Sequence, residues 1–479
     1  MASGYIELSM DAVEVLISII SIHSHRPAVK DYSVQLQHTK TASNMSNPRL
    51  EACPAHQALA RGMGFKNNHE KLWWATFGPL LERLLALCDY PMSLQYRHLS
   101  FVYRHVLPYL GPYPTVENGW VWKTCYSPDG TPAEVSLNFD GPRKTARMDH
   151  VPMSRWSGTL QDPFSQNVAL ESIKSLAAIL PDFTWEWFDY FVQRMYIPES
   201  STETVLARQP PEFVHMIMQG VNGYDLLDSG VRVKPIFNGL AKSVETGISL
   251  DKILFDSIRS NTELFGAYHP ALKVIEGYCQ SDQAKQFGTK ACFLSFDATN
   301  TKDARLKIYL HGPQTAYIKV QDAFTLGGRL DSPNIQAGVK ELRKLWYGVL
   351  NLPPDFPESE DLPVTDDLYQ GWQANFELRP NNPVPEPKVY IPVAINNKDQ
   401  ESIVQGLQEF FSRHDSMDVQ DYRHIFETLF LDGDKLTGIH HFITFSYKSH
   451  PYVTCYYKPH VVPVPAKELE EPDVKDLSK

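Results

Sequence analysis

The stretch "RLKIYL", residues 305–310, decides the fold. Side chains of an extended strand alternate between its two faces, so one face carries Arg305, Lys307 and Tyr309 while the other carries only leucine and isoleucine. The apolar face predicts packing against a core. The basic face either meets solvent or lines an enclosed site, and the rest of the sequence favours the enclosed site.

The composition narrows the class of protein. The 479-residue chain is 43% hydrophobic and 21% charged, which is typical of a soluble globular protein. Its formal net charge of −11 argues against binding to a nucleic-acid backbone, so clusters of lysine and arginine are expected to be local and specific. Six cysteines lie far apart without a C-x-x-C pair. This usage favours reduced thiols in a cytoplasmic protein over a disulfide framework or a zinc site.

The sequence divides into an N-terminal arm and linker (1–54), a main domain (55–460) and an acidic tail expected to be disordered (461–479). The arm contains the apolar run "VEVLISIISI" (13–22), which is too short to span a bilayer. Acidic residues precede this run, whereas a secretory signal begins with basic ones. We therefore expect an amphipathic helix or a packing arm, and no membrane partner.

One pattern recurs through the main domain, namely helical periodicity followed by a pair of strand-like runs. The helical stretches lie near 70–108, 163–196, 243–280, 333–350 and 399–429. The paired runs are AEVSLNF (133–139) with KTARMDHV (144–151), GYDLL (223–227) with VRVKPIF (231–237), CFLSF (292–296) with RLKIYL, ANFELR (374–379) with KVYIPV (388–393), and HFITFSYK (441–448) with YVTCYYK (452–458). GYDLL is the weakest of these runs, because it hardly alternates.

Five such ααββ units predict an α+β protein whose ten antiparallel strands close into a β-barrel surrounded by α-helices. Closure removes exposed strand edges, and ten strands leave a lumen wide enough for a ligand. The alternative is an open sheet whose polar face is wet. Two features favour a barrel with a polar lumen. Helices precede all five hairpins, and the polar strand faces combine Arg, Lys and Tyr with few acids, unlike the mixed charges of a solvated face.

Basic residues on the strands predict an anion site in that lumen. They are Arg147, Lys234, Arg305, Lys307, Lys388 and Lys448. Arginine binds phosphate in a fork and lysine binds it as a point charge, while tyrosine rings stabilise a carbocation, so the set suits an allylic diphosphate. No metal is expected, because metal-ligand spacing is lacking. In particular, TDDLYQ (365–370) is not D-D-x-x-D, the aspartate pattern with which many prenyl-diphosphate enzymes bind metal.

Four motifs, in order, carry a family resemblance: GTPAEVSLNF (130–139), ARLKIYLHG (304–312), KVYIPV (388–393) and FITFSYKSHPYVTCYYKPH (442–460). Over residues 55–460 the chain resembles the fungal dimethylallyltryptophan synthase-type aromatic prenyltransferases. The resemblance implies a ten-stranded barrel inside a ring of helices, the ABBA prenyltransferase fold. It also implies transfer of a dimethylallyl group from dimethylallyl diphosphate to an indole in secondary metabolism, without a required cofactor and without essential magnesium.

The resemblance also implies residue roles. Glu134 matches the glutamate that accepts a hydrogen bond from the indole N–H, and it is the implied catalytic residue. The implied diphosphate-binding set, whose tyrosines also shield the allyl cation, comprises Arg147, Lys234, Arg305, Lys307, Tyr309, Lys388, Tyr390, Lys448, Tyr452 and Tyr456. The implied partners are small-molecule substrates, with neither nucleic acid nor membrane, and the chain is expected to be a monomer or homodimer.

Departures from the family pattern bear on the acceptor. Ile236 and Phe442 stand where the family has shield tyrosines, and Lys388 stands where glutamine is common. The segment MIMQGVNGYDLL (216–227) lacks the lysine that acts as base in tryptophan prenylators. These differences favour a tryptophan-containing cyclic dipeptide or an indole alkaloid over free tryptophan. The alternatives are a prenyltransferase for a non-indole aromatic and a non-catalytic barrel that carries an anionic ligand.

Overall fold

The computed structural model describes residues 53–124, 126–176, 179–208, 218–299, 304–363, 371–397, 399–431 and 437–470. Within these ranges it contains ten strands. They are β1 (Ala133–Asp140), β2 (Arg143–His150), β3 (Gly220–Leu227), β4 (Gly230–Phe237), β5 (Lys290–Phe296), β6 (Leu306–Gly312), β7 (Trp372–Leu378), β8 (Glu386–Ile391), β9 (His440–Tyr447) and β10 (Pro451–Tyr457). Each predicted strand is present, and β3 begins three residues before GYDLL.

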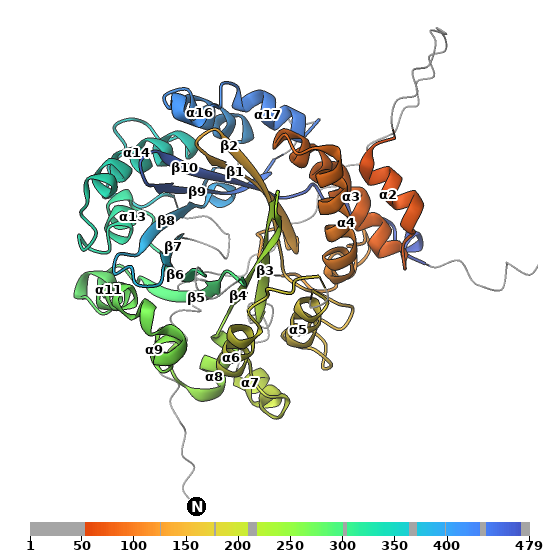
Figure 1. Ribbon diagram of the computed structural model, residues 1–479, viewed down its shortest axis with the longest axis horizontal. Helices are drawn as coiled ribbons and strands as arrows, with labels where there is room; N and C mark the ends of the chain where they lie inside the picture. Colours follow the sequence, from red (N-terminus) through yellow and green to blue (C-terminus); the bar gives the residue numbers. More distant parts are fainter. Residues whose placement is uncertain are drawn as a thin grey trace, which may run out of the picture.

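The strands form one closed barrel in the order β1-β10-β9-β8-β7-β6-β5-β4-β3-β2, seen end-on in Figure 1. All neighbouring pairs are antiparallel, and consecutive strands form the hairpins. The barrel closes where β1 pairs with β10, with Val135 opposite Tyr457. Closure pairs the edges that an open sheet would expose. The predicted barrel is therefore confirmed, and the open-sheet alternative is wrong.

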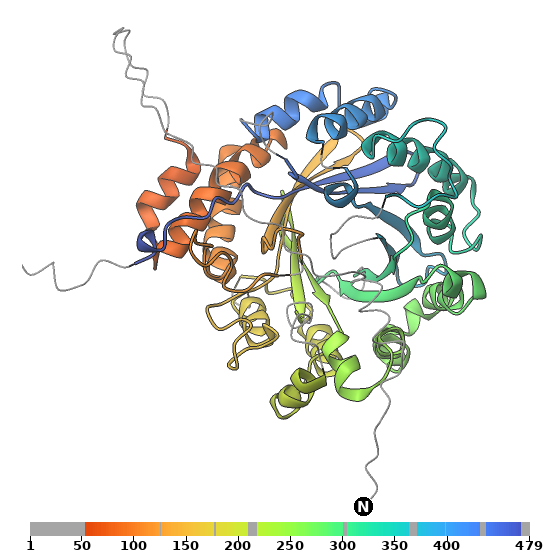
Figure 2. The same cartoon turned by 180° about the vertical axis from the view of Figure 1, so that it is seen from behind.

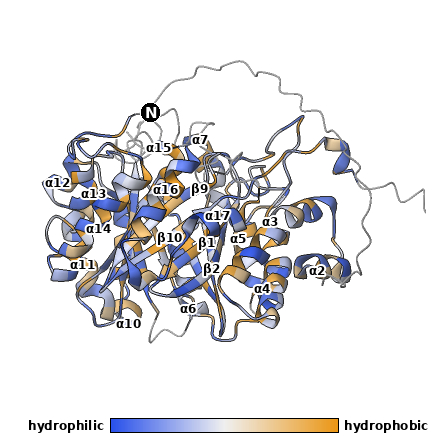
Figure 3. Ribbon diagram, turned by 90° about the horizontal axis from the view of Figure 1, so that it is seen from above, coloured by the Kyte–Doolittle hydropathy of each residue, from blue (hydrophilic) through white to orange (hydrophobic). Residues whose placement is uncertain are grey.

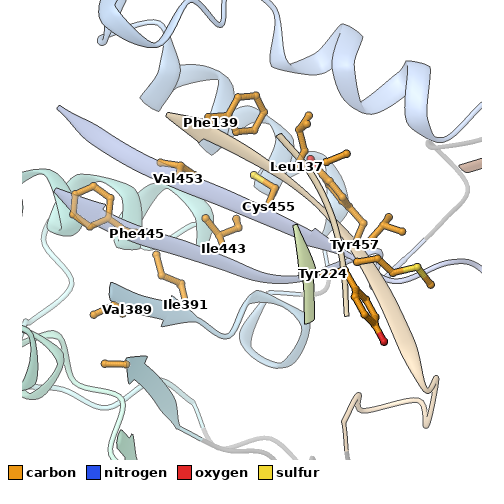
Figure 4. Packing of buried hydrophobic residues seen from close by; sticks show 14 of the residues in the cluster. Leu137, Phe139, Tyr224, Val389, Ile391, Ile443, Phe445, Val453, Cys455 and Tyr457 are labelled. Carbon is orange, nitrogen blue, oxygen red and sulfur yellow. The ribbon is translucent and has the colours of Figure 1, made fainter. Parts of the chain in front are cut away.

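The outward faces of the strands are apolar and form the core with the helices. Val135, Leu137 and Phe139 of β1 are fully buried. Figure 4 shows Leu137 and Phe139 with outward residues of β3, β8, β9 and β10, among them Ile443 and Val453. Because strand side chains alternate, the same pattern turns the polar faces into the lumen.

Helices surround the barrel, as the views from both sides in Figures 1 and 2 show. They are α2 (Ala55–Met63), α3 (Asn68–Leu87), α4 (Met92–His105), α5 (Gln166–Lys174), α6 (Trp185–Met195), α7 (Thr202–Arg208), α8 (Leu240–Thr246), α9 (Leu250–Arg259), α10 (Thr262–Phe265), α11 (His269–Cys279), α12 (Asp282–Gln286), α13 (Tyr317–Phe324), α14 (Pro333–Val349), α15 (Val393–Asn396), α16 (Gln400–Phe411) and α17 (Tyr422–Leu429). Helices precede every hairpin, so the repeated ααββ organisation is confirmed.

The helices are amphipathic, and the mixed colours of the helices in Figure 3 reflect this. In α16 an apolar stripe, which includes Leu407 and Phe410, is buried, and the Asp399 side chain caps the helix. Gly406 lets α16 approach α14 closely, because a Cβ there would overlap the backbone of Gly348. The helices α2, α7, α12, α13 and α15 were not predicted, because four to nine residues span too few turns to show a period.

The two ends of the chain differ from the prediction in one respect. Residues 461–470, expected to belong to a disordered tail, contact the loop before β1: Val116 N donates to Val464 O at 2.9 Å, and Ala466 N donates to Glu117 Oε2 at 2.9 Å. These two hydrogen bonds hold the segment in place. The rest of the predicted tail (471–479) and residues 1–52 of the predicted arm and linker (1–54) lie outside the described residues. Among the helices described here, none combines the length and the apolar character that a membrane crossing requires.

Candidate active site

The lumen contains a cavity lined by the polar strand faces. Every predicted site residue except Lys448 lines it: Glu134, Arg147, Lys234, Arg305, Lys307, Tyr309, Lys388, Tyr390, Tyr452 and Tyr456. These side chains come from β1, β2, β4, β6, β8 and β10, or from the residue just before β6. Strand alternation thus gathers residues that are up to about 300 positions apart in sequence.

Cations and carboxylates cross the lumen in what we call the charged layer. Its cations are Arg147, Lys234, Arg305, Lys307 and Lys388, and its carboxylates are Asp225, Asp297 and Glu377. At one side, Asp225 Oδ1 of β3 lies 2.5 Å from Lys234 Nζ and 2.9 Å from Arg147 Nε. Although burial opposes ionisation, these two cations hold the pKa of Asp225 well below its usual value.

The other side of the charged layer is built around Arg305. Its Nε donates to Asp297 Oδ2 at 2.6 Å, and its Nη1 donates to Glu377 Oε2 at 2.9 Å. Lys307 Nζ donates to Asp297 Oδ1 at 3.2 Å. Each cation of the layer is therefore partnered by a carboxylate of the protein, and the layer is a network of ion pairs.

The charged layer, as defined above, contains five cations and three carboxylates. Burial lowers the pKa of Lys307 to about 8, although Asp297 favours its charged form. Burial likewise lowers the pKa of Lys388. For Tyr452, burial is outweighed by Arg147 and Lys388, which lower the pKa of the phenol. Cations thus outweigh carboxylates here, so an anion that entered the layer would be stabilised.

The carboxylates of the charged layer correct the expectation that the polar strand faces hold few acids. Asp225 lies two residues after Gly223 on β3, and Glu377 lies two residues after Asn375 on β7. Strand alternation therefore places both carboxylates on the lumen face. Counting residues along β3 and β7 could therefore have found them. Asp297 follows the end of β5 and carries no such signal. The physical reason for the acids is that several cations cannot share a buried space without counter-charges.

A second cavity lies on the other side of the charged layer. Six residues line both cavities: Arg147, Asp225, Arg305, Glu377, Lys388 and Tyr452. Lys448 lines only the second cavity, where its side chain is 55% exposed and its Nζ lies 3.3 Å from Glu386 Oε2. The structure therefore places Lys448 apart from the other predicted residues, toward the solvent side of the layer.

Aromatic side chains line the first cavity next to the charged layer. The ring centroid of Tyr390 lies 6.1 Å from that of Tyr309 and 6.0 Å from that of Tyr456. Phe442 approaches Tyr390 edge-on at 5.9 Å, and Ile236 completes the wall. The two departures from the family pattern thus leave apolar side chains where hydroxyl groups would stand. The ring faces provide a surface suited to a carbocation.

Glu134 lies at the far end of the first cavity, which we call the Glu134 end. Its Oε1 accepts a hydrogen bond from Tyr126 Oη at 2.5 Å, and its Oε2 lies 2.6 Å from His441 Nδ1. Only 3% of Glu134 is exposed. The loop before β1 holds Tyr126 in position, because Ser127 Oγ donates to Thr131 O at 2.8 Å. The carboxylate is therefore fixed in orientation, with lone pairs left for a ligand N–H.

Sequence reasoning missed Tyr126 and His441. Strict alternation would turn His441 outward, since its neighbour Phe442 faces the lumen. The pairing of β9 with β10 shifts register between Cys455 and Tyr457, and this bulge lets both His441 and Phe442 line the cavity. Tyr126 lies on an irregular loop, where no periodic signal exists. Neither residue could have been placed from the strand pattern alone.

The sequence and the fold match known proteins. Residues 69–424 match the model of the tryptophan dimethylallyltransferase family. The chain is 79% identical to the indole diterpene prenyltransferase atmD of Aspergillus flavus over 91% of this chain and 100% of the relative. It is 34% identical to the indole diterpene prenyltransferase janD of Penicillium janthinellum, over 84% and 94%. The crystal structure of NotF in complex with brevianamide F and DMSPP aligns with a TM-score of 0.74 and 25% identity, over 86% and 100%.

Proposed function

Because the chain belongs to the tryptophan dimethylallyltransferase family and is an indole prenyltransferase that uses dimethylallyl diphosphate, we propose that its acceptor is an indole diterpene. The observation that carries this proposal is the 79% identity to an indole diterpene prenyltransferase over the full length of that relative. Of the two acceptor classes that the sequence favoured, the proposal selects the indole alkaloids over the cyclic dipeptides. It sets aside the non-catalytic carrier, because the family consists of enzymes.

The wall of the cavity supports a large apolar acceptor. Its lining beyond the charged layer includes Met218, Val221, Leu240 and Leu250. A polycyclic hydrocarbon buries apolar surface against such a wall at about 25 cal/mol per Å². Free tryptophan would instead bring an ammonium and a carboxylate, which need polar partners when they are buried.

In the proposed reaction, the charged layer binds the diphosphate. Arg147, Lys234, Arg305, Lys307 and Lys388 would donate to its oxygens, and Lys448 would attract it from the second cavity. These contacts strengthen as the C–O bond of the substrate breaks and negative charge grows on the leaving group, so they accelerate ionisation. The tyrosine rings, led by Tyr390, then shield the dimethylallyl cation from water.

Glu134 orients the acceptor in this proposal. Tyr126 and His441 fix its carboxylate, which would accept a hydrogen bond from the indole N–H. That hydrogen bond raises electron density in the ring and sets the attacking atom next to the allyl cation. The chemistry requires no metal, because arginine and lysine neutralise the leaving group.

An acceptor screen tests the proposal. The purified protein is incubated with dimethylallyl diphosphate and, in separate reactions, an indole diterpene, a tryptophan-containing cyclic dipeptide, L-tryptophan and a phenol. Mass spectrometry then measures the gain of one prenyl unit. We expect the highest kcat/KM with the indole diterpene. A higher kcat/KM with the cyclic dipeptide or with tryptophan would overturn the assignment of the acceptor, and a preference for the phenol would favour the non-indole alternative.

A further inference from the structure

Asp149 of β2 is a lumen carboxyl group that the binding of diphosphate does not require. It is the cross-strand partner of Glu134 on β1 and of Gly223 on β3, and it lines the first cavity. Only 9% of it is exposed. A Cβ at Gly223 would overlap the Asp149 carboxyl group, so this glycine leaves the space that the side chain occupies.

Asp149 differs from the other lumen carboxylates in its partners. The carboxylates of the charged layer are ion-paired, and Glu134 is held by Tyr126 and His441. Among the residues that the structure describes, none donates a hydrogen bond to Asp149. A buried polar group without a hydrogen bond is uncommon and needs an explanation. A ligand group in the cavity supplies one.

The position of Asp149 lies between the two halves of the site. The charged groups that act on it are Glu134, Arg147, Asp225 and Lys234. It acts in turn on the phenols Tyr126, Tyr309, Tyr390 and Tyr456. Asp149 therefore stands beside both the carboxylate that would hold the indole N–H and the tyrosines that would surround the cation. The ring carbon under attack has to lie in the same space.

We propose that Asp149 is the catalytic base that removes the proton from the prenylated ring carbon, an inference that rests on the proposed function. The C–O bond of dimethylallyl diphosphate breaks and its electron pair leaves on the diphosphate. A π pair of the ring forms the new C–C bond. The Asp149 carboxylate then takes the proton from that ring carbon, and the C–H electron pair restores aromaticity. This assigns the task that lysine performs in tryptophan prenylators to a residue on the neighbouring strand.

The environment of Asp149 suits this task. Burial, with the nearby charges of Glu134 and Asp225, raises its pKa to about 7, while Lys234 opposes the shift. A base works best when its pKa lies near the working pH, because it is then both ionised and a good proton acceptor. Since the carboxylate is the active form, turnover should fall as the pH drops below about 7.

The test uses Asp149→Asn, which keeps the size of the side chain but cannot accept the proton. We expect kcat to fall by about 10²–10⁴-fold. With an acceptor deuterated at the ring, the variant should show a primary isotope effect on kcat that the wild-type protein lacks, because proton removal has become the slow step. The loss of rate at low pH should disappear as well. Asp149→Ala should recover activity when formate is added. Asp256→Asn, on the outer face of α9, is the matched control and should behave as wild type.

The outcomes separate this inference from the acceptor assignment. A near wild-type kcat, or a raised KM without an isotope effect, would show that Asp149 only binds the acceptor and would overturn the inference. The inference would also be overturned if Asp149→Asn lost kcat without an isotope effect and formate failed to restore the activity of Asp149→Ala. If the screen instead identifies another indole as the preferred acceptor, the same comparison is made with that indole. The assignment of Asp149 then stands or falls independently of the diterpene.

Discussion

Replacing Lys307 with methionine separates binding of the diphosphate from folding. The Lys307 side chain is 7% exposed, and its Nζ lies 3.2 Å from Asp297 Oδ1. Burial lowers its pKa from 10.5 to about 8. At about 1.4 kcal/mol per pKa unit, this fall means that holding the charged form in the folded protein costs about 3.5 kcal/mol. Methionine has a similar length and no charge, so it removes this cost.

The free energy of unfolding should therefore stay the same or rise in Lys307→Met. The lost ion pair with Asp297 opposes the gain, but Arg305 still pairs with that carboxylate at 2.6 Å, so no buried charge is left alone. Diphosphate affinity should move the other way. One charge-assisted hydrogen bond is worth about 1.5–3 kcal/mol, so Kd should rise roughly 10- to 150-fold.

Two further lysines calibrate the measurement. Lys448 is 55% exposed and lies on the second cavity, so Lys448→Met should weaken binding by at most about 1 kcal/mol, or roughly fivefold. Lys252 lies on α9, pairs with Asp256 at the surface and should have no effect on Kd when replaced by methionine. Isothermal titration with inorganic diphosphate gives Kd, and thermal unfolding gives the change in stability.

Two results would refute this reasoning. If Lys307→Met binds diphosphate as tightly as the wild type, the charged layer is not the anion site. If the variant unfolds at a much lower temperature, Lys307 serves the fold, and the cost assigned to its burial is wrong. A larger loss of affinity for Lys448→Met than for Lys307→Met would place the diphosphate in the second cavity.

Three other predictions follow from the same site. Glu134→Gln should lower kcat by about 10²–10⁴-fold with little change in diphosphate Kd, because glutamine lacks the negative charge that polarises the indole N–H. A near wild-type initial rate would contradict this role. Binding of diphosphate at pH 8 should be accompanied by uptake of protons, because the bound anion raises the pKa of Lys307 above its value of about 8. Near pH 6 the uptake should vanish, because the lysine is already protonated there. Calorimetry in buffers of different ionisation enthalpy measures the uptake, and its absence at pH 8 would contradict the lowered pKa. Turnover should survive EDTA with only a modest loss of rate, and full loss with rescue by magnesium would sink the metal-independent mechanism.

Strand alternation explains why much of the site could be predicted from sequence. In RLKIYL, the polar residues Arg305, Lys307 and Tyr309 alternate with leucine and isoleucine, and this pattern assigned all three to one face. The helices before each hairpin then determined that this face was inside. Parity also located Arg147 on β2 and Lys234 on β4, because the outward faces of these strands pack under helices.

What could not be predicted depends on local breaks in alternation and on loops. His441 faces the lumen only because a bulge shifts the register of β9 against β10. Asp297 and Tyr126 reach the lumen from irregular segments beyond strand ends. Such positions are set by tertiary contacts, so the counter-charge Asp297 and the clamp of Tyr126 and His441 on Glu134 emerge only in three dimensions.

The pairing of β1 with β10 closes the barrel, and this seam runs through both halves of the site. At the charged layer, Arg147 of β2 donates through Nη2 to Tyr452 Oη of β10 at 2.6 Å. At the opposite end, Glu134 of β1 meets His441 of β9. Each contact joins residues about 300 positions apart, and the β1–β10 pairing brings both together. An open sheet would separate both pairs at once. The substrates bind groups from both sides of the seam, so they should stabilise the closed barrel over any open form by mass action.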